Sequence, residues 1–375
     1  MEEKCEKWCG RACTLMMVLG PTIPFFEAVS EFVSRPVMVI DTNFDLEGQQ
    51  AIVTGGCDGI GEEVSRHLLQ AGANVILGCR NMTKAARVVQ DLQRKTAAEE
   101  SQIQAWPLEL DSFASVESFA DRFLKSDGEL HLLINNAGTK ESCVYTEDHQ
   151  ELALQVNHLA HFLLTNRLLP KMKASQAARV VHVVCDAAYD GAVDGDNLNP
   201  SQDAAQEAVA GVSIERCSAA KQYSTAKLAQ LAFSDELDRR LRAEAGGEAD
   251  IASIAVDPGT TATSLHSKAP PVSPRRSLQQ RILGYLPPFL ILGWLRDYSL
   301  AAMERSVPHG AGAVVHVATS PALARAGGGL YSDRASALFG CGKPAVECGL
   351  LRQMPNKWSL WGRSPRTTAE AARMP

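Results

Sequence analysis

The 375-residue sequence lacks the marks of several large functional classes. It has no Cys-x-x-Cys pair and no cluster of histidine and cysteine residues with the spacing of zinc ligands, so no metal site is expected. Its formal net charge of −6 provides no positive field for nucleic acid. Its ten cysteines stand at scattered spacings, which in a chain of this length indicates reduced, intracellular thiols better than a disulfide framework.

Long uninterrupted apolar runs are missing as well. The run 12–26 is broken by Pro21 and Pro24, and the run 282–295 is split by two consecutive prolines. Neither run has the form of a usual membrane-spanning helix. Acidic residues close to the N-terminus also argue against a secretory signal.

The first 46 residues are expected to form an extension ahead of the folded domain. Cys5, Cys9 and Cys13 recur every four residues, so a helix here would carry three thiols on one face. An acylated segment that contacts a membrane has this arrangement. An extension packed on the domain is the alternative.

From residue 47 onward, apolar runs alternate with helical patterns. The alternation predicts a single α/β domain, a doubly wound parallel sheet with helices on both faces, over residues 47–333. Residues 334–375 form a C-terminal tail. The expected strands are 51–54, 75–77, 103–108, 131–134, 180–184 and 251–255, and the expected helices are 62–71, 83–96, 115–125, 152–173 and 226–242.

A glycine-rich turn follows the first expected strand. Gly55, Gly59 and Gly61 lack a Cβ, so the backbone can bend sharply and approach a pyrophosphate closely. The phosphates would lie at the positive N-terminus of the next helix. The turn predicts nucleotide binding, and an ordinary tight turn is the alternative.

The end of the second strand is where a dinucleotide fold meets the adenosine ribose. An acidic residue there binds the 2′-hydroxyl, and a cation favours a 2′-phosphate. Cys79 and Arg80 supply no acid and one cation, which predicts NADP as the cofactor with NAD as the alternative. Asp58 could repel that phosphate, and Arg80 could be an ordinary surface cation. Asp111 follows the third strand, where it could bind the adenine amino group or cap the next helix.

Tyr223 and Lys227 stand four residues apart, so on a helix both side chains lie on one face. A tyrosine has an ordinary pKa near 10, about three units too high for a base at neutral pH. A nearby ammonium group and an oxidised nicotinamide would lower that pKa. The pair therefore predicts an acid/base tyrosine.

Taken in order, these motifs resemble the short-chain dehydrogenase/reductase family. The matching positions run from Thr54 to Gly61, from Asn135 to Gly138, through Tyr223 and Lys227, and on to Pro258-Gly259. Within the family the chain is similar to the retinol-dehydrogenase-like branch. That branch includes the oxidoreductase domain of the WW-domain-containing oxidoreductase and polyprenol-dehydrogenase-like proteins. The resemblance implies a Rossmann-type fold.

The resemblance also assigns roles to residues. Tyr223 would be the acid/base, Lys227 would hold the nicotinamide ribose, and Asn157 would anchor a water that relays protons to Lys227. The alternative is a structural role, in which the Asn157 side chain stabilises a kink in the helix. The implied cofactor-binding residues are Gly55, Cys57, Asp58, Gly59, Ile60, Gly61, Arg80, Asp111, Asn136, Ala137, Gly138, Tyr223, Lys227, Pro258, Gly259 and Thr263.

One position departs from the family pattern. The catalytic serine of the family ends the fifth strand, and here Cys185 takes that place. A thiol is a weaker donor than a hydroxyl, so it should polarise the substrate oxygen poorly. Two functions therefore stay open: an NADP-dependent oxidoreductase, and a nucleotide-binding redox sensor or interaction protein with little turnover.

The segment 264–310 corresponds to the substrate lid of the family. Its apolar run 282–295 follows Arg275, Arg276 and Arg281, which fits a wall over a lipophilic substrate or a patch that contacts a membrane surface. An ordinary core helix is the alternative. The expected substrate is a retinoid, steroid or polyprenol-like alcohol, aldehyde or ketone. The expected location is the cytoplasm or the membrane periphery, including the endoplasmic reticulum, and a homodimer is compatible with the resemblance.

Overall fold

The computed structural model describes residues 44–175, 177–193, 218–247, 249–259, 261, 306–323 and 327–332. Predictions for residues 1–43, 262–305 and 333–375 fall outside these described residues. The chain divides into two compact units, Met1–Val39 with Pro270–Ser306 and Ile40–Ala269 with Val307–Pro375. All described residues except Ser306 belong to the second unit.

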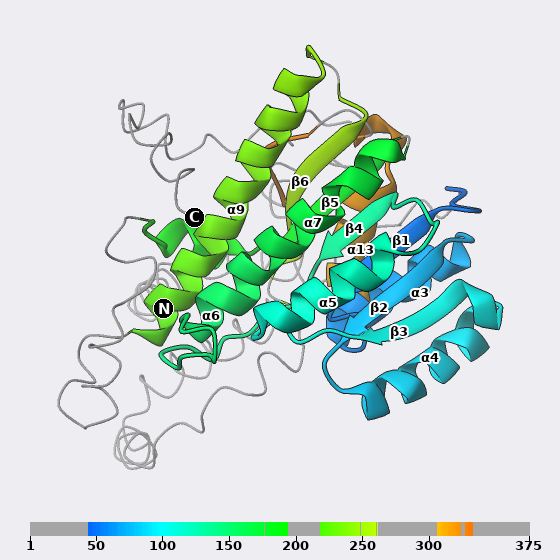
Figure 1. Cartoon of the computed structure of the whole chain (residues 1–375), viewed down its shortest axis with the longest axis horizontal. Helices are drawn as coiled ribbons and strands as arrows, with labels where there is room; N and C mark the ends of the chain where they lie inside the picture. The colour runs from blue at the N-terminus through cyan, green and yellow to red at the C-terminus, as the bar shows by residue number, and fades with distance from the viewer. Residues whose placement is uncertain are drawn as a thin grey trace, which may run out of the picture. The chain divides into compact units, whose positions relative to one another are not determined.

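A parallel seven-stranded sheet runs through the described part of the second unit, in the order β3-β2-β1-β4-β5-β6-β7 (Figure 1). The order reverses between β1 and β4, which lie side by side although two strands separate them in sequence. Open α/β sheets bind ligands at the carboxyl ends of the strands beside such a reversal. The strands are β1 (Gln50–Thr54), β2 (Asn74–Cys79), β3 (Ile103–Pro107), β4 (Leu132–Asn135), β5 (Ala178–Val183), β6 (Ile251–Asp257) and β7 (Leu330–Ser332).

Helices bury both faces of this sheet, which explains why most strand residues are apolar and buried. On one face, Val64 of α3 and Val314 of α13 join a core with Val53 of β1. On the other, Phe123 of α5 and Leu168 of α7 pack in a second core, and Figure 1 shows α5, α7 and α9 on this side. The predicted doubly wound α/β fold is confirmed. The helices are α3 (Gly59–Gln70), α4 (Met82–Thr96), α5 (Phe113–Leu124), α7 (Ala160–Ala174), α9 (Ala219–Glu244) and α13 (Val307–Thr319).

The helix expected over 152–173 is interrupted. A short α6 (Leu152–Leu154) leads into a π-helical turn, η2 (Gln155–Leu159), before α7 begins at Ala160. Such π-turns are frequent at functional sites. Sequence periodicity missed the interruption because a single wider turn barely changes the apolar pattern. Three 3₁₀ turns complete the described elements: η1 (Glu100–Gln102), η3 (Asp186–Asp190) and η4 (Pro321–Leu323).

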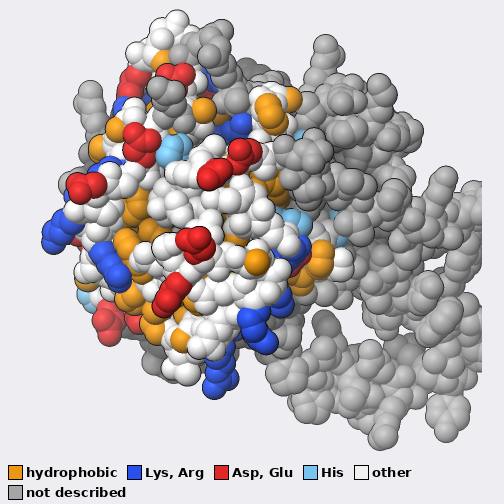
Figure 2. Space-filling model, turned by 90° about the vertical axis from the view of Figure 1, so that its right-hand side faces the viewer, with side chains coloured by type: hydrophobic (Ala, Val, Ile, Leu, Met, Phe, Trp, Pro, Cys, Tyr) orange, Lys and Arg blue, Asp and Glu red, His pale blue; other side chains and the backbone are white. Residues whose placement is uncertain are grey.

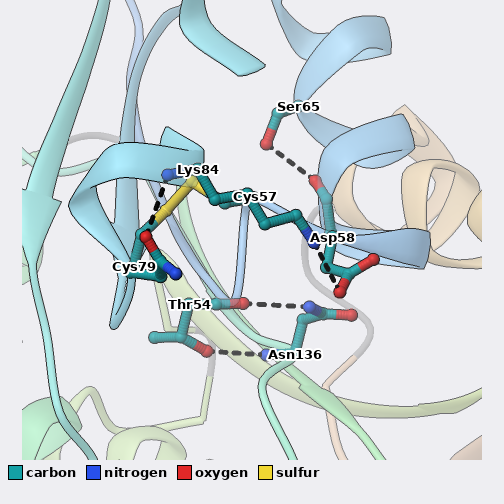
Figure 3. Close-up of a disulfide and its surroundings, with 9 residues drawn as sticks. Thr54, Cys57, Asp58, Ser65, Cys79, Lys84 and Asn136 are labelled. Atoms are coloured by element: carbon teal, nitrogen blue, oxygen red, sulfur yellow. Dashed lines mark hydrogen bonds and ion pairs between the residues drawn. A yellow bond between two sulfur atoms is a disulfide. The ribbon is translucent and has the colours of Figure 1, made fainter. Parts of the chain in front are cut away.

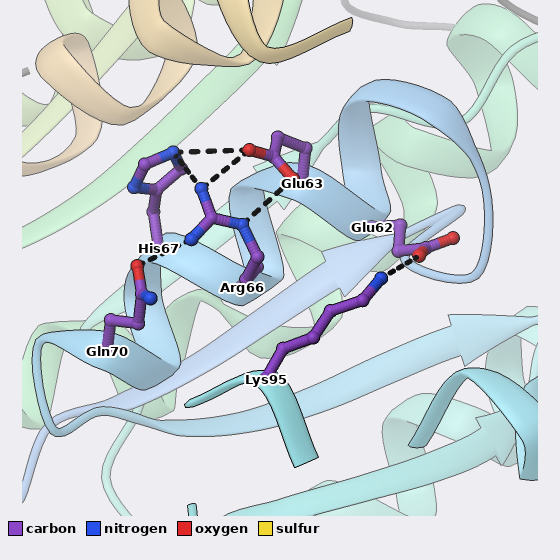
Figure 4. A network of polar contacts seen from close by, with 6 residues as sticks. All are labelled: Glu62, Glu63, Arg66, His67, Gln70 and Lys95. Atoms are coloured by element: carbon purple, nitrogen blue, oxygen red, sulfur yellow. Dashed lines mark hydrogen bonds and ion pairs between the residues drawn. The ribbon is translucent and has the colours of Figure 1, made fainter. Parts of the chain in front are cut away.

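The outward face of α3 carries a polar network (Figure 4). Glu63 accepts hydrogen bonds from Arg66, and Arg66 also donates to Gln70 at 2.7 Å. The hydrogen bonds from His67 and Arg66 lower the pKa of Glu63 to about 2. Lys95 of α4 lies 4.0 Å from Glu62, linking the two helices.

Acidic and basic side chains are interspersed on the face shown in Figure 2. This mixed surface offers no extended field of one sign on that face. None of the described helices is long and apolar enough to cross a bilayer.

Candidate functional site

Thr54, at the end of β1, ties the glycine-rich turn to the end of β4 (Figure 3). Its Oγ1 accepts hydrogen bonds from the backbone N–H groups of Asn136 and Ala137, each at 3.0 Å. The Asn136 side chain in turn donates to the Thr54 carbonyl at 2.9 Å. These bonds fix the Asn-Asn-Ala-Gly segment against the turn, so two distant sequence motifs form one site.

The turn leaves no room for side chains at its key glycines. Gly55 has a φ of +65°, which disfavours any residue with a Cβ. A Cβ on Gly61 would lie 2.4 Å from the Gly55 carbonyl oxygen and 2.5 Å from Asn136 Nδ2. The N-terminus of α3 has no hydrogen bond from the side chain of its N-cap residue, Asp58. A helix N-terminus without a side-chain cap, next to a close-packed glycine turn, is suited to bind the pyrophosphate of a dinucleotide.

A lysine that the sequence did not single out neutralises Asp58. Lys84 Nζ, from the first turn of α4, lies 2.6 Å from Asp58 Oδ2. Asn81 caps α4 by accepting from the Lys84 N–H at 2.9 Å. Arg80 is exposed immediately before this cap. The repulsion expected between Asp58 and a 2′-phosphate is therefore offset, because the carboxylate already has a cation beside it. The only hint of this ion pair in the sequence is a second cation, Lys84, four residues after Arg80.

Cys57 and Cys79 are joined by a disulfide (Figure 3). Their Cα atoms lie 6.0 Å apart, a usual distance for such a bond. The expectation of reduced thiols is thus wrong for this pair. The reason is tertiary: β1 pairs with β2 and brings the turn beside the strand end, although 22 positions separate the cysteines in sequence. Cys57 is one of the implied cofactor-binding residues, and its contact with a cofactor stays a prediction.

Asp111 lies half-buried between β3 and α5. The capping role considered for it belongs to its neighbour, since the Ser112 side chain accepts from the Ser115 N–H. That alternative for Asp111 is wrong. Contact with an adenine stays a prediction.

The catalytic candidates meet beside the carboxyl end of β5. Cys185 Sγ lies 3.5 Å from the Tyr223 hydroxyl oxygen. Lys227 is buried, and its Nζ donates to the Val183 carbonyl at 3.0 Å. That Nζ lies 5.9 Å from the centre of the Tyr223 ring, and Lys140 Nζ lies 5.8 Å from it. The helix α9 therefore presents Tyr223 and Lys227 to one point, as their spacing predicted.

Burial is the main influence on the pKa values of Tyr223 and Lys227. Burial, and next the charge of an ionised Cys185, raise the pKa of Tyr223 well above its ordinary value. Burial also lowers the pKa of Lys227. Lys227 and an oxidised nicotinamide together were expected to lower the tyrosine pKa. The lysine by itself does not do so in this structure, because desolvation of the phenolate outweighs the attraction. The effect of the nicotinamide stays a prediction. Tyr223 is protonated at neutral pH here.

Asn157 lies in the π-turn η2 and is fully buried. Its Oδ1 accepts from the Thr139 N–H and its Nδ2 donates to the Thr139 carbonyl, both at 2.9 Å. A Cβ on Gly138 would lie 2.7 Å from Asn157 Oδ1 and 3.6 Å from Lys227 Nζ. The side chain thus ties the chain after β4 to the irregular helix, and Asn157, Gly138 and Lys227 converge at one place.

A buried histidine connects the turn to Asn157. His161 Nε2 lies 3.0 Å from Thr54 Oγ1, and its Nδ1 lies 3.3 Å from the Asn157 carbonyl oxygen. Thr54 Oγ1 already accepts two backbone hydrogen bonds, so its proton has two acceptors, the Ile134 carbonyl at 3.3 Å and His161 Nε2. Burial lowers the pKa of His161 to about 3, which keeps the ring neutral. Sequence reasoning missed this residue because a lone histidine on a helix carries no signal.

The last motif follows β6. Pro258 is buried, and the Gly259 N–H donates to Asp257 Oδ1 at 2.8 Å. Thr263 lies outside the described residues, so its contact with a cofactor stays a prediction. The other implied positions stand at the ends of β1, β2, β4, β5 and β6 or on helices beside them, at one edge of the sheet.

Comparisons with known proteins identify the family of the chain. The family model described as short chain dehydrogenase matches residues 49–196. Human retinol dehydrogenase 11 is 33% identical over 253 residues, which cover 67% of this chain and 73% of that protein. Human retinol dehydrogenase 12 is 36% identical over 229 residues, which cover 60% of this chain and 66% of that protein.

A solved structure has the same fold. The crystal structure of L-sorbose reductase from Gluconobacter frateurii, complexed with NADPH and L-sorbose, superposes with a TM-score of 0.54. It covers 77% of this chain and 96% of that chain at 17% identity. At this identity the likeness concerns the fold alone.

Proposed function

Because this chain belongs to the short-chain dehydrogenase family and is similar to its retinol dehydrogenases, we propose that it uses NADP(H) to interconvert a lipophilic alcohol with its aldehyde or ketone. The family membership makes it a nicotinamide-dependent oxidoreductase. The choice of NADP and the substrate class are the parts proposed here.

The adenosine end of the site supports NADP over NAD. Arg80 is exposed at the end of β2, and Cys79 stands where an acid would select the 2′-hydroxyl. The Lys84–Asp58 ion pair removes the one opposing charge in the turn. This pairing of Asp58 with Lys84 is the observation that carries the proposal, since it leaves Arg80 to bind a 2′-phosphate.

In the proposed reaction, the nicotinamide supplies or accepts the hydride. Tyr223, protonated in this structure, would donate its proton to the alkoxide that forms when a carbonyl is reduced. Lys227 would hold the nicotinamide ribose from below the phenol. Cys185, 3.5 Å from the same hydroxyl, would donate the second hydrogen bond to the substrate oxygen. Asn157 would keep Gly138 and the loop around Thr139 in place around them.

A lipophilic substrate is supported by similarity and by sequence. Two human relatives carry the name retinol dehydrogenase. The substrate in that name, retinol, is an apolar alcohol. The apolar run 282–295, at the lid position of the family, offers a matching wall. It lies outside the described residues.

A screen of alcohols, aldehydes and ketones with both cofactors tests the proposal. We expect turnover of retinoid, steroid or polyprenol-like compounds, at least tenfold more efficient with NADP(H) than with NAD(H). Short polar substrates serve as the control class and should be turned over poorly. Equal efficiency with both cofactors would contradict the cofactor assignment, and turnover confined to polar substrates would contradict the substrate class.

A second candidate function rests on Cys185. A thiol in place of the hydroxyl weakens one of the two hydrogen bonds to the substrate oxygen, and the raised Tyr223 pKa disfavours the base needed for alcohol oxidation. A nucleotide-binding sensor or interaction protein with slow turnover is consistent with both features. Binding of NADPH with no turnover across the screen would select this alternative.

A further inference from the structure

The disulfide between Cys57 and Cys79 joins two segments that recognise the same part of a dinucleotide. Cys57 lies in the glycine-rich turn, and Cys79 ends β2, directly before Arg80. In this fold the adenosine ribose lies between the turn and the strand end. We propose that Cys57 and Cys79 form a thiol–disulfide exchange site for low-molecular-weight disulfides of the glutathione type, and that its oxidation weakens dinucleotide binding. The second half rests on the proposed function.

The fold holds the two cysteines together in either redox state. Thr54 pairs with Gly78 in the sheet, and the Gly55 N–H donates to the Gly78 carbonyl at 2.9 Å. These contacts flank both cysteines and do not depend on the sulfur atoms. Reduction therefore leaves two thiols at bridging distance, and oxidation can occur again without unfolding the sheet.

The bond changes the chemistry of the ribose site. A thiol can donate a weak hydrogen bond and can rotate away from a ligand, whereas a disulfide has no proton to donate and cannot rotate freely. Oxidation fixes two sulfur atoms across the space between the turn and the strand end. The 2′-phosphate of NADPH would then lose weak thiol donors at the position where NAD-binding members of such folds carry an acid. Weaker binding of the oxidised form follows.

A second contact crosses the same gap. Figure 3 shows Lys84 reaching Asp58 beside the disulfide, so an ion pair also links α4 to the turn. This pair has exposed side chains and stays in place when the cysteines are reduced. The relative position of turn and strand end is therefore kept, and the redox effect is confined to the two sulfur atoms.

The exchange balances in atoms and electrons. One thiolate of the pair attacks a sulfur of the small disulfide, releasing one small thiolate and forming a mixed disulfide. The second thiolate attacks the protein sulfur of that mixed disulfide and releases the other small thiolate. Two electrons pass from the cysteine pair to the small disulfide, and the two protons lost by the cysteines are taken up by the two released thiolates. Both cysteines are buried, which favours a small reagent over a protein partner.

The coupling between cysteine oxidation and NADPH binding can be measured either as a change in the Kd for NADPH or as a change in the exchange equilibrium. If oxidation raises the Kd for NADPH by a given factor, NADPH must shift the exchange equilibrium toward the dithiol by the same factor. We expect that factor to be about tenfold or more, corresponding to about 1.4 kcal/mol.

The test equilibrates the full chain in buffers with a series of reduced-to-oxidised glutathione ratios, with and without saturating NADPH. Alkylation and peptide mass spectrometry report the fraction of Cys57–Cys79 disulfide, and NADPH fluorescence reports the Kd of each form. Cys57→Ser and Cys79→Ser should each give a Kd that no longer responds to the glutathione ratio. The matched control, Cys185→Ala, removes another thiol near the site and should keep the response.

The outcomes are distinct. A disulfide that never forms, or an oxidised form that binds NADPH as tightly as the reduced one, overturns the inference. A response that persists in Cys57→Ser also overturns it. If the pair exchanges normally but reduced protein binds neither NADPH nor NADH, the proposed function fails, and the exchange site stands on the mass spectrometry alone.

Discussion

The Sγ atom of Cys185 lies 3.5 Å from the hydroxyl oxygen of Tyr223. Among the described cysteines, Cys185 is the only one that is not in a disulfide. The resemblance to the family assigns this position to the catalytic serine. A thiol is a weaker donor than a hydroxyl, so we expect the substitution to lower the rate of this site.

The first prediction restores the donor. Cys185→Ser should raise turnover by about one to two powers of ten, or about 1.4–2.8 kcal/mol of transition-state stabilisation, because a hydroxyl donates more strongly to the substrate oxygen. Steady-state kinetics with the best substrate of the screen measures this change. Tyr223→Phe is the control and should abolish turnover while NADPH still binds. Unchanged or lower turnover in Cys185→Ser would show that the thiol is not the limiting feature.

The second prediction concerns pH. Because the Tyr223 pKa is raised, the phenol is an acid ready to donate at neutral pH and a poor base. Carbonyl reduction should therefore proceed at pH 7, whereas kcat/KM for alcohol oxidation should rise about tenfold per pH unit from pH 7 to 9. Cys185→Ser should move the oxidation profile to lower pH, since an ionised Cys185 is one cause of the raised pKa. A flat oxidation profile would contradict this protonation state.

The third prediction separates the two cations at the adenosine end. Arg80→Ala should reduce the preference for NADPH over NADH about tenfold, the effect of losing one charge-assisted hydrogen bond to the 2′-phosphate. Lys84→Ala should also reduce it, since Asp58 then faces the phosphate without its partner.

The double variant Lys84→Ala with Asp58→Asn is the control for this prediction. Removing both charges of the pair should restore most of the preference. Titrations of NADPH and NADH by fluorescence give the ratios. A preference that survives Arg80→Ala unchanged would assign the phosphate to another residue.

The fourth prediction concerns stability in mild acid. Burial lowers the pKa of both His161 and His182 to about 3. Above the ordinary histidine pKa of about 6.5, these histidines are neutral in both the folded and the unfolded protein. Below pH 6.5 they become protonated in the unfolded protein only. The free energy of unfolding should therefore fall as pH drops from 6.5, by about 1 kcal/mol per histidine at pH 5.5.

Urea unfolding at pH 7.5 and 5.5 measures this loss. His182→Gln, which cannot titrate, should lose less stability between the two pH values than the wild type does. The comparison of pH slopes remains informative even where the substitution itself destabilises the fold. Equal slopes would show that His182 does not stay neutral in the folded state.

The fifth prediction concerns membranes and rests on the sequence outside the described residues. The proline-broken apolar runs 12–26 and 282–295 favour contact with a membrane surface. The full chain should partition partly with membranes after cell lysis, and deletion of residues 1–44 should reduce that fraction while NADPH binding is kept. A full chain found wholly in the soluble fraction would favour the lid interpretation of the second run.

The sequence alone determined the fold class and predicted which residues form the candidate site. Apolar runs of three to six residues, glycines at fixed spacing and the Tyr223–Lys227 pair are local signals, and local geometry imposes each of them. The expected helix boundaries were less accurate: α9 begins at Ala219, ahead of Tyr223, and the π-turn around Asn157 was not foreseen. The start of α9 is marked by a local cap, since the Ser218 side chain accepts from the Lys221 N–H, whereas the side chain of Asn157 in the π-turn bonds to the backbone of Thr139, 18 residues away.

Only the tertiary structure decided which distant residues meet. The disulfide between Cys57 and Cys79 exists because β1 and β2 are neighbours in the sheet, and scattered cysteine spacings gave no hint of it. Lys84 cancels the charge of Asp58, and His161 joins Thr54 to Asn157, because the turn, α4 and α7 converge on one edge. The Tyr223 pKa is set by burial, a property of the packed interior that no spacing of residues encodes.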